Sequence, residues 1–409
     1  MIICSKAYFR RASANLALGK AKMALRDFKT VCTLAPRDKV ASEKMKACKK
    51  EVQRQQFEDA IEKEEQKSMG LDIDAMEVEA SYDGPHLGTG GEVTMEFVHA
   101  MMERFRSEKL IHAKYVAKIL VAAKTYFKTC KSCIRVPLPK NDDDSHINVC
   151  GDTHGQFYDL CNIWNIGGMP SENNPYLFNG DFVDRGSFSF EVVLTLIATK
   201  LACPTGLYML RGNHETKNMN KIYGFEGEIQ HKYNRGIMQL FCDVFQWLPL
   251  CAVINDGVFV VHGGLTTDRE GRVPLSEIEV IPRGCEPPDA GLMSDLLWAD
   301  PQPMPGRSPS KRGVGFAFGP DITQNFLEHN GLSLVVRSHE VKDEGYVVEH
   351  DGKCITIFSA PNYCDSMGNK GAFIRFGPDN NPHFTQYDAV PHPNVPPMRY
   401  AGMMGQFGL

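Results

Sequence analysis

Three short clusters of metal-ligating residue types, each directly after an apolar run, constrain the fold of this chain more than any other feature. The apolar runs INVC (147–150), YLFN (176–179) and GLYML (206–210) have the length and composition of buried β-strands. The clusters that follow them are GDTHG (151–155), GDFVDRG (180–186) and RGNHE (211–215). Amphipathic stretches between the runs predict helices, and strand, helix, strand in succession is typical of right-handed crossover units. We therefore expect sheets covered by helices, with the chemistry in loops at strand ends.

The side chains in these clusters are oxygen and imidazole ligands that bind metal ions in proteins. Two later histidines, His262 and His339, also follow apolar runs, VFVV (258–261) and SLVV (333–336). Carboxylate, amide and imidazole ligands without a thiolate favour manganese, iron or zinc. An isolated GDxHG could be a turn whose aspartate caps a helix, but three clusters in succession with two further histidines predict a metal centre.

The order of the clusters resembles the phosphoprotein phosphatase family of metallophosphoesterases, whose signature is GDxHG, GDxVDRG and GNHE. The resemblance extends over about residues 100–395 and includes LLWADP (296–301), VRSHE (336–340) and SAPNYCD (359–365). It implies an α/β fold of the α+β kind, in which a central β-sandwich is flanked by helices. A partial all-α tetratricopeptide repeat segment is expected to precede this fold.

The resemblance also implies two divalent metal ions per chain, with manganese as the expected ion and iron or zinc as alternatives. The ligands implied for the first ion are Asp152, His154 and Asp181, and those for the second are Asp181, Asn213, His262 and His339. A carboxylate such as Asp181 can bridge ions that lie ~3.5–4 Å apart and lower the pKa of a shared water. The expected function is hydrolysis of phosphoserine and phosphothreonine in proteins by the resulting hydroxide.

The family's catalytic and substrate-binding roles carry over to six further positions. His214 is expected to protonate the departing oxygen as the general acid, with Asp184 as its orienting partner. Arg185 and Arg337 match the arginines that clamp the phosphate, a task suited to a planar guanidinium that stays charged. Arg211 and Tyr363 are expected to line the substrate pocket, although core packing is an alternative for Tyr363.

Two other functional classes compete with this interpretation. Another metallophosphoesterase, such as a nuclease or nucleotidase, would share the two-metal chemistry but is disfavoured by the complete GDxVDRG and GNHE pair. A non-catalytic repeat scaffold would require a lost metal ligand, and none is missing from the sequence. The CxxC of Cys130 and Cys133 has no second pair, so we expect ordinary thiols rather than a zinc site.

The segment 5–38 resembles one 34-residue tetratricopeptide repeat and predicts a helix, a turn and a second helix. The matching positions are Tyr8, Ala12, Gly19, Ala24, Phe28 and Pro36. A solvated amphipathic helix is the alternative. Residues 40–67 continue as a charged helical stretch. Because one repeat cannot bury its own apolar face, we expect an N-terminally truncated member of the type 5 branch, in which repeats precede the phosphatase domain.

That resemblance implies a protein partner for the repeat segment. In this branch, basic and amide residues of the repeats bind the acidic C-terminus of the ninety-kilodalton heat-shock chaperone. Lys6 and Arg10 match two of these clamp positions. The other clamp residues would belong to upstream repeats. We therefore expect phosphoprotein substrates, with the chaperone C-terminus as a further partner.

Charge and composition divide the chain into modules. The first 70 residues hold 16 Lys and Arg against 9 Asp and Glu, whereas residues 71–409 hold 29 against 41. The acidic majority argues against nucleic acid as a partner. Glycines and acidic residues between the modules have the composition of a linker. The expected domains are 1–68 for the repeat and following helix, 69–94 for the linker and 95–409 for the phosphatase.

The sequence also indicates a cellular compartment. No apolar run approaches the ~18–20 residues needed to span a bilayer, and the opening residues lack the core of a signal peptide. The 13 cysteines lack the spacing of a disulfide framework. We therefore expect a cytoplasmic or nuclear protein with no membrane partner.

Overall fold

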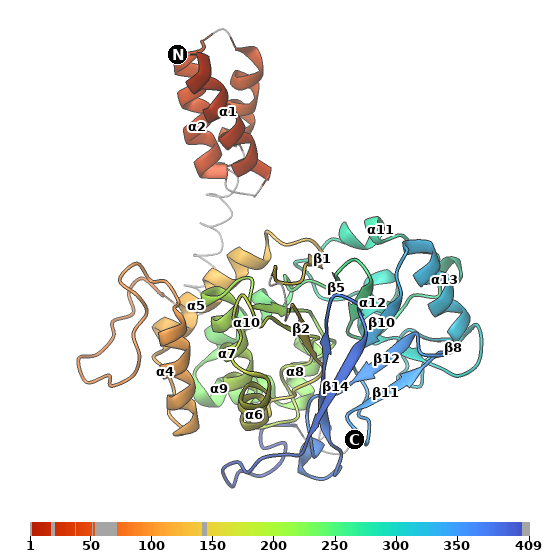
Figure 1. The fold of residues 1–409 in the computed structure, drawn as a ribbon. Helices are drawn as coiled ribbons and strands as arrows, with labels where there is room; N and C mark the ends of the chain where they lie inside the picture. The colour runs from red at the N-terminus through yellow and green to blue at the C-terminus, as the bar shows by residue number, and fades with distance from the viewer. Residues whose placement is uncertain are drawn as a thin grey trace. The chain divides into compact units, whose positions relative to one another are not determined.

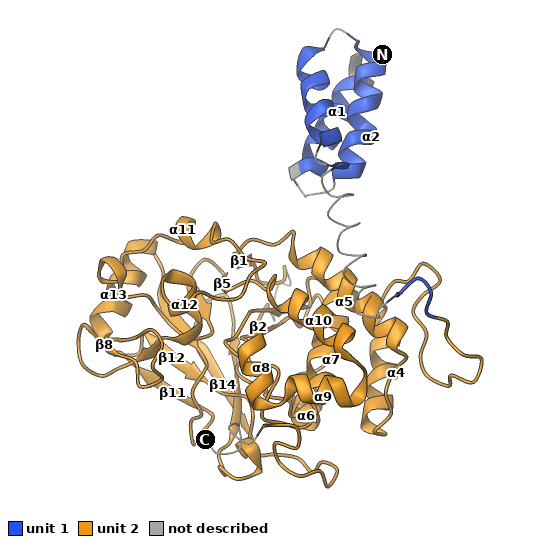
Figure 2. Ribbon diagram, turned by 180° about the vertical axis from the view of Figure 1, so that it is seen from behind, with its two compact units in different colours: residues 1–76 blue, residues 77–409 orange. Residues whose placement is uncertain are grey.

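The computed structural model describes two compact units, residues 1–76 and 77–409 (Figures 1 and 2). The described residues are 2–17, 21–36, 38–50, 52–53, 72–140 and 145–402. None of the described helices is long and apolar enough to cross a membrane. Each unit has its own buried hydrophobic core.

The first unit is a helical hairpin followed by further helical residues. Its helices are α1 (Ile2–Ala17) and α2 (Ala21–Leu34), and residues 39–50 and 52–53 are also helical. The small side chains of Ala12 and Ala24 let the helices approach closely, and Phe28 and Cys48 complete the core. The two predicted helices are therefore confirmed, whereas the predicted turn falls on residues 18–20, outside the described residues. Gly19 and residues 54–67 of the charged stretch lie outside the described residues.

Two β-sheets form the centre of the second unit (Figure 1). One has the order β1-β5-β6-β10-β12-β11: β1 (Cys133–Val136), β5 (Cys251–Ile254), β6 (Val258–Val261), β10 (Leu334–Arg337), β12 (Cys354–Ile357) and β11 (Tyr346–Glu349). The other has the order β14-β13-β2-β3-β4: β14 (Pro382–Tyr387), β13 (Gly371–Phe376), β2 (Ile147–Cys150), β3 (Tyr176–Phe178) and β4 (Leu207–Met209). A small third sheet has the order β7-β9-β8: β7 (Asp300–Pro301), β9 (Phe316–Phe318) and β8 (Arg307–Pro309).

The alternation of side chains along the strands explains how the two large sheets pack. In β6, Val258 and Val260 join a buried cluster that contains side chains of both sheets. Phe259 and Val261 point the other way, into a cluster formed with helices. The sheets therefore share one core face to face, which confirms the predicted β-sandwich.

Helices cover the outer faces of the sandwich. The cluster outside the six-stranded sheet includes α11 (Leu275–Glu279), α12 (Leu292–Trp298) and α13 (Pro320–Asn330), with Phe326 of α13 4.8 Å from Phe259 between ring centroids. Beside the five-stranded sheet, Trp164 of α6 meets Phe178 edge-on at 6.4 Å. The remaining helices are α4 (Met95–Arg106), α5 (Ala113–Phe127), α6 (Phe157–Gly167), α7 (Ser189–Ala202), α8 (Lys217–Tyr223), α9 (Phe225–Lys232) and α10 (Arg235–Phe245). Short 3₁₀ turns lie at η1 (Asp268–Gly271) and η2 (Tyr363–Asp365).

Parallel pairing brings the ends of the predicted strands together. The apolar runs before the three clusters are β2, β3 and β4, and they pair in parallel in that order. β6 and β10, which precede the two later histidines, also pair in parallel. The carboxyl ends of parallel strands meet at one edge of a sheet, so the loops that follow these strands converge.

The second unit begins at Glu77, inside the segment 69–94 for which a linker is expected. Asp83 forms an ion pair of 2.8 Å with Arg104 of α4. His86 and Tyr115 of α5 share a hydrogen bond of 2.5 Å. These contacts attach residues 77–94 to the second unit, because polar side chains in this glycine-containing stretch find partners on α4 and α5.

A buried lysine joins α7 to α9. Lys232 lies 2.6 Å from Glu191 and 2.8 Å from Glu228, and Glu228 accepts hydrogen bonds from the backbone N–H groups of Ser189 and Phe190 at the start of α7. We expect Lys232→Met to lower the free energy of unfolding by about 3–5 kcal/mol, because two buried carboxylates lose their cation. Urea unfolding measures this change. The exposed Lys118→Met is the matched control, and an equal loss in both variants would contradict the prediction.

Candidate metallophosphoesterase active site

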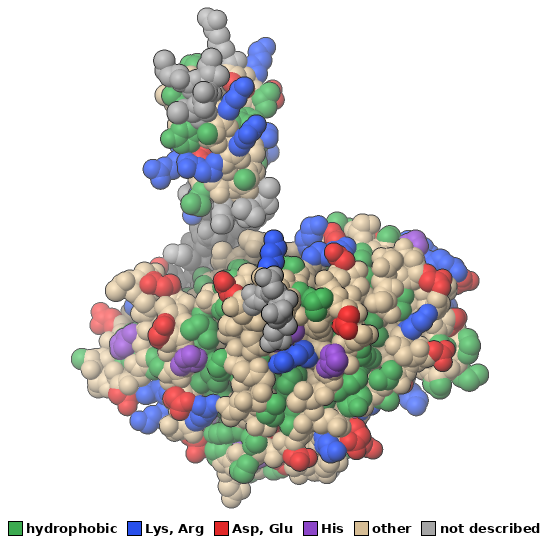
Figure 3. All heavy atoms as spheres, in the orientation of Figure 1, with side chains coloured by type: hydrophobic (Ala, Val, Ile, Leu, Met, Phe, Trp, Pro, Cys, Tyr) green, Lys and Arg blue, Asp and Glu red, His purple; other side chains and the backbone are tan. Residues whose placement is uncertain are grey.

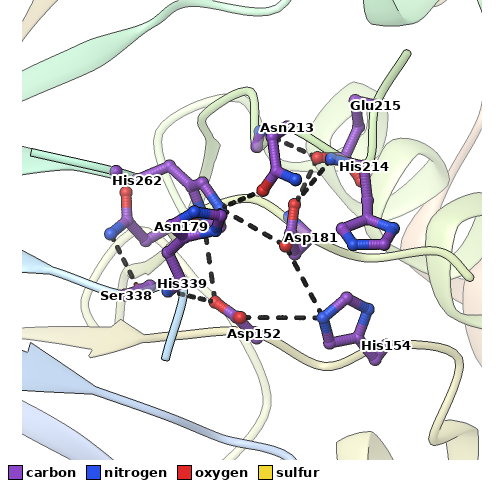
Figure 4. Close-up of polar contacts among 12 residues, drawn as sticks. Asp152, His154, Asn179, Asp181, Asn213, His214, Glu215, His262, Ser338 and His339 are labelled. Carbon is purple, nitrogen blue, oxygen red and sulfur yellow. Dashed lines mark hydrogen bonds and ion pairs between the residues drawn. The ribbon is translucent and has the colours of Figure 1, made fainter. Parts of the chain in front are cut away.

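The loops after five strands deliver the predicted metal ligands to one cluster (Figure 4). Asp152 follows β2, Asp181 follows β3 and Asn213 follows β4. His262 follows β6 directly and His339 follows β10. All of these side chains, together with His154, are buried. The structure therefore brings the six side chains expected for metal binding to one place.

Asp181 occupies the middle of the cluster. Its Oδ2 atom lies 3.5 Å from Nε2 of His154 and 3.3 Å from Nε2 of His262. Its Oδ1 atom accepts a hydrogen bond of 2.9 Å from the backbone N–H of His214. One carboxylate oxygen thus faces imidazoles from both expected sites, as a bridging ligand must.

Asp152 links the two sides of the cluster at a second point. Its Oδ2 lies 3.7 Å from Nε2 of His154, and its Oδ1 accepts a hydrogen bond of 3.1 Å from the backbone N–H of His339. Burial, together with the charge of Asp181, raises the pKa of Asp152 to about 7. A bound cation would offset this concentration of negative charge.

The histidine rings are oriented as metal ligands. Nδ1 of His154 contacts the carbonyl oxygen of Val183 at 2.9 Å, and Nδ1 of His262 contacts that of Asn179 at 2.8 Å. A carbonyl can only accept, so each Nδ1 carries a proton and each Nε2 faces the cluster. The charge of Asp181 outweighs burial and raises the pKa of His262 to about 9, so a bound cation would displace the proton on its Nε2. Burial lowers the pKa of His154 to about 3, which keeps its imidazole neutral.

The side chains expected to bind the second ion also converge. Nε2 of His262 lies 3.0 Å from Oδ1 of Asn213 and 3.2 Å from Nδ1 of His339. Nε2 of His339 is buried and has no hydrogen-bond partner among the described residues. Imidazole nitrogens and an amide oxygen that converge in a buried site match the donor set of the implied ions.

His214 and Asp184 form the expected pair beside the cluster. Nδ1 of His214 donates to Oδ2 of Asp184 over 2.8 Å. Asp184 also accepts hydrogen bonds from Asn220 and from the backbone of Phe225, so its position is fixed. Burial acts to lower the pKa of His214, but the charge of Asp181 and the bond to Asp184 outweigh it and raise that pKa. The ring is thus held in the protonated form that a general acid needs.

Arg185 has free donors beside the cluster. Its Nε and Nη1 atoms are buried and have no hydrogen-bond partner among the described residues. Its guanidinium lies over the ring of Tyr223, 4.1 Å from the centroid. A buried guanidinium with unused donors is suited to binding an anion.

The expectation that Arg337 clamps phosphate is wrong. Its side chain is fully buried and donates to Asp300, Glu340 and the carbonyl oxygens of Gly263 and Ala299. Side chains alternate along β10, so Arg337 points to the same face as Val335, toward the helices and away from the cluster.

The structure also contradicts the expectation that Arg211 lines the substrate pocket. This arginine is fully buried, and it donates to the backbone oxygens of Glu215 and Cys285. It has no exposed surface with which to meet a substrate.

Sequence reasoning missed Arg312, an exposed arginine close to the cluster. It donates to Asp300 over 2.6 Å and 3.2 Å and to the carbonyl oxygen of His339 over 3.0 Å. No apolar run precedes Arg312, so no strand could be predicted that would place it. The ring of Tyr363 is half-buried and lies 5.1 Å from that of His154 between centroids, and its role in lining the substrate pocket stays a prediction.

Glu215 is a second residue whose part the sequence did not reveal, although it belongs to the RGNHE motif. Its carboxylate accepts hydrogen bonds of 2.8–2.9 Å from the backbone N–H groups of Asp181, Phe182 and Gly212. It therefore ties the loop after β3 to the loop after β4 and positions Asp181 between them.

Gly212 allows these two loops to touch. A Cβ atom at this position would overlap the carboxylate and the backbone nitrogen of Asp181. We expect Gly212→Ala to lower metal affinity by about 10- to 100-fold, because Asp181 must move. Calorimetric titration with Mn²⁺ measures the affinity. Gly377→Ala is the control, since its Cβ would lie 3.7 Å from the nearest atom; unchanged affinity in Gly212→Ala would refute the close-approach explanation.

Lys6 and Arg10 belong to α1 of the first unit. Both are exposed and are one helical turn apart, so they share a face. Lys and Arg side chains are prominent on the surface of this unit (Figure 3). The role of these two residues in binding a partner stays a prediction.

The sandwich, the strand-end loops and the paired acidic and imidazole ligands define a metallophosphoesterase. Residues 145–343 match the model of the calcineurin-like phosphoesterase family, and residues 45–135 match that of the PPP5 TPR repeat region. The metallophosphoesterase family binds two divalent metal ions, and the cluster around Asp181 offers the ligands for them.

Individual relatives show to which family of metallophosphoesterases the chain belongs. Human serine/threonine-protein phosphatase 5 is 52% identical over 408 residues, which cover 99% of this chain and 81% of the relative. Serine/threonine-protein phosphatase T of Trypanosoma brucei is 52% identical over 405 residues, or 98% of this chain and 84% of the relative. A solved Saccharomyces cerevisiae phosphatase described as similar to human PP5 aligns with a TM-score of 0.72 and 44% identity, covering 75% of this chain and all of that one. The chain belongs to the serine/threonine-protein phosphatase 5 family.

Proposed function

We propose that this protein hydrolyses phosphoserine and phosphothreonine esters in other proteins. The observation that carries the proposal is the convergence of five other ligating side chains around Asp181, with His214 and Arg185 beside them. A metal cluster, an acid and an anion-binding guanidinium are the parts that phosphate ester hydrolysis requires.

Two divalent ions are proposed for the cluster. Asp152, His154 and Asp181 would hold one ion, and the second would be held by Asp181, Asn213, His262 and His339. The mixture of carboxylate, amide and imidazole ligands suits manganese, with iron or zinc as alternatives. When bound, the ions would lower the pKa of a shared water and offset the charge of the phosphate.

The chain's own residues supply the remaining chemistry. Arg185 would bind phosphate oxygens with its unused Nε and Nη1 donors, and Arg312 offers a second guanidinium near His339. Nδ1 of His214 is occupied by Asp184, so its proton on Nε2 would pass to the departing seryl or threonyl oxygen. Tyr363 would border the phosphate beside His154.

A comparison of substrates tests the proposal. Purified protein with Mn²⁺ is expected to release phosphate from a phosphoserine peptide with a much higher kcat/KM than from a nucleotide. Metal analysis of the same sample is expected to find two ions per chain. Faster turnover of the nucleotide would instead favour the alternative metallophosphoesterase activity.

The first unit would bind a partner protein. Lys6 and Arg10 form an exposed basic pair, which would bind the acidic C-terminal carboxylate of a chaperone. The described cysteines form no disulfide, in keeping with the reducing cytoplasm or nucleus as the proposed location. Loss of binding to an acidic C-terminal peptide in Lys6→Glu would support the clamp, and unchanged binding would count against it.

A further inference from the structure

A pocket opens beside Arg185, which is one of its lining residues. Its empty space is about 450 Å³ when the open solvent at its mouth is counted with it, so the enclosed part is smaller. Four segments line it: residues 155–159 after β2, residues 185–188 after β3, residues 364–365 at η2, and four residues between 392 and 398. Arg185 is therefore shared between the pocket and the phosphate-binding region.

The walls of the pocket are mainly apolar. Phe188 meets Tyr158 edge-on at 5.2 Å between ring centroids, and Val395, Pro397 and Met398 face them from the C-terminal segment. The hydroxyl oxygen of Tyr158 is buried and has no hydrogen-bond partner among the described residues. These surfaces favour a neutral apolar side chain and disfavour a charged one.

The acidic groups at the pocket already have partners. Asp365 lies 3.1 Å from Nε2 of His392. Asp159 accepts hydrogen bonds from the side chain of Gln156 and from the backbone N–H of Val390. No carboxylate of the described lining is therefore left to attract a basic side chain.

Hydrogen bonds hold the C-terminal wall in place. The hydroxyl of Ser187 donates to the carbonyl oxygen of Pro396 over 3.1 Å and accepts from the backbone N–H of Arg399 over 3.3 Å. Together with the bond from Val390 to Asp159, these contacts fix the wall against the loop after β3. The pocket exists before any ligand arrives, which lowers the entropic cost of filling it.

We infer that this pocket is a specificity subsite that accepts an apolar side chain of the phosphoprotein substrate. The inference rests on the proposed phosphatase function. An extended substrate rises ~3.3 Å per residue, so a side chain one or two residues from the phosphoserine reaches the pocket when Arg185 holds the phosphate. The subsite selects substrates by the residue next to the phosphorylated one.

Peptides of one design test the inference. Each carries one phosphoserine in an alanine and glycine background, with a single leucine placed in turn at the two positions before and the two positions after it. With the full-length protein and Mn²⁺, we expect one leucine position to raise kcat/KM by about tenfold over the all-alanine peptide. Val395→Asp is expected to reduce this preference to within about twofold, because it places a carboxylate in the wall.

Matched variants separate the subsite from other effects. Val280→Asp makes the same change at an exposed residue outside the pocket and is expected to keep both the activity and the leucine preference. If Val395→Asp does not fold, Pro397→Glu at an exposed position of the same wall repeats the test.

Equal turnover of all peptides by the unaltered protein would overturn the subsite, as would a leucine preference that survives both wall variants. If a pocket variant instead changes the oligomeric state, the pocket is an interface with a second copy of the chain and not a substrate subsite. Turnover of none of the peptides would refute the proposed function itself.

Discussion

Replacing Asp181 with Asn is expected to remove both metal ions and to lower phosphopeptide turnover by on the order of a thousandfold or more. One oxygen of this carboxylate faces His154 on one side and His262 on the other. An amide keeps the shape of the side chain but loses the negative charge that a bridging ligand supplies. Because the residue serves both expected sites, the two ions are predicted to be lost together. Metal content and kcat/KM, measured on the same preparation, check this.

The matched control is Asp256→Asn in the turn between β5 and β6. The carboxylate of Asp256 is 92% exposed, so the same chemical change there should leave metal content and rate unaltered. An Asp181→Asn protein that retains two ions and a normal rate would contradict the bridging role. Loss of a single ion would show that Asp181 belongs to only one site.

Replacing His214 with Asn is expected to affect substrates according to their leaving groups. A serine alkoxide needs a proton as it departs, so turnover of a phosphoserine peptide should fall by about 10²–10⁴. The nitrophenolate of p-nitrophenyl phosphate leaves without that help, so its turnover should fall much less. Parallel kinetics with the two substrates measure the difference.

The metal content of the His214→Asn variant shows whether His214 is a general acid or a metal ligand. The ligand atoms of His214, His154 and Asp181 lie within 4.8 Å of one another, so His214 is close enough to bind an ion. However, its Nδ1 is engaged by Asp184. We therefore expect His214→Asn to keep both ions. The exposed His329→Asn is the control; equal losses on the two substrates, or a missing ion, would rule out the general-acid role.

The sequence was most informative where a buried strand ends in a cluster of ligands. The runs before Asp152, Asp181 and Asn213 are strands, because apolar β-branched and aromatic residues suit the interior of a sandwich. Parallel pairing of those strands then brings the ligands together. Local pattern and chain topology agree at these positions, which is why the metal cluster could be predicted without coordinates.

The arginines were harder to predict because their partners are distant in the sequence. Arg337 adjoins a ligand in the chain, yet its position in β10 turns it toward Asp300. Arg312 reaches the cluster only because Asp300 and the backbone of His339 hold it there. Neither contact leaves a periodic signal, so motif position alone assigned the wrong arginine to the phosphate.

The origin of the ligands in two different sheets has a consequence for protein synthesis. Asp152, Asp181 and Asn213 come from one sheet, whereas His262 and His339 come from the other, with nearly 190 positions between the first and the last. A nascent chain that has emerged from the ribosome only through α12 has about three quarters of its sequence. It still lacks His339, one of the ligands expected for the second ion. We therefore expect phosphatase activity to begin only after translation has passed His339 and the two sheets have packed against each other.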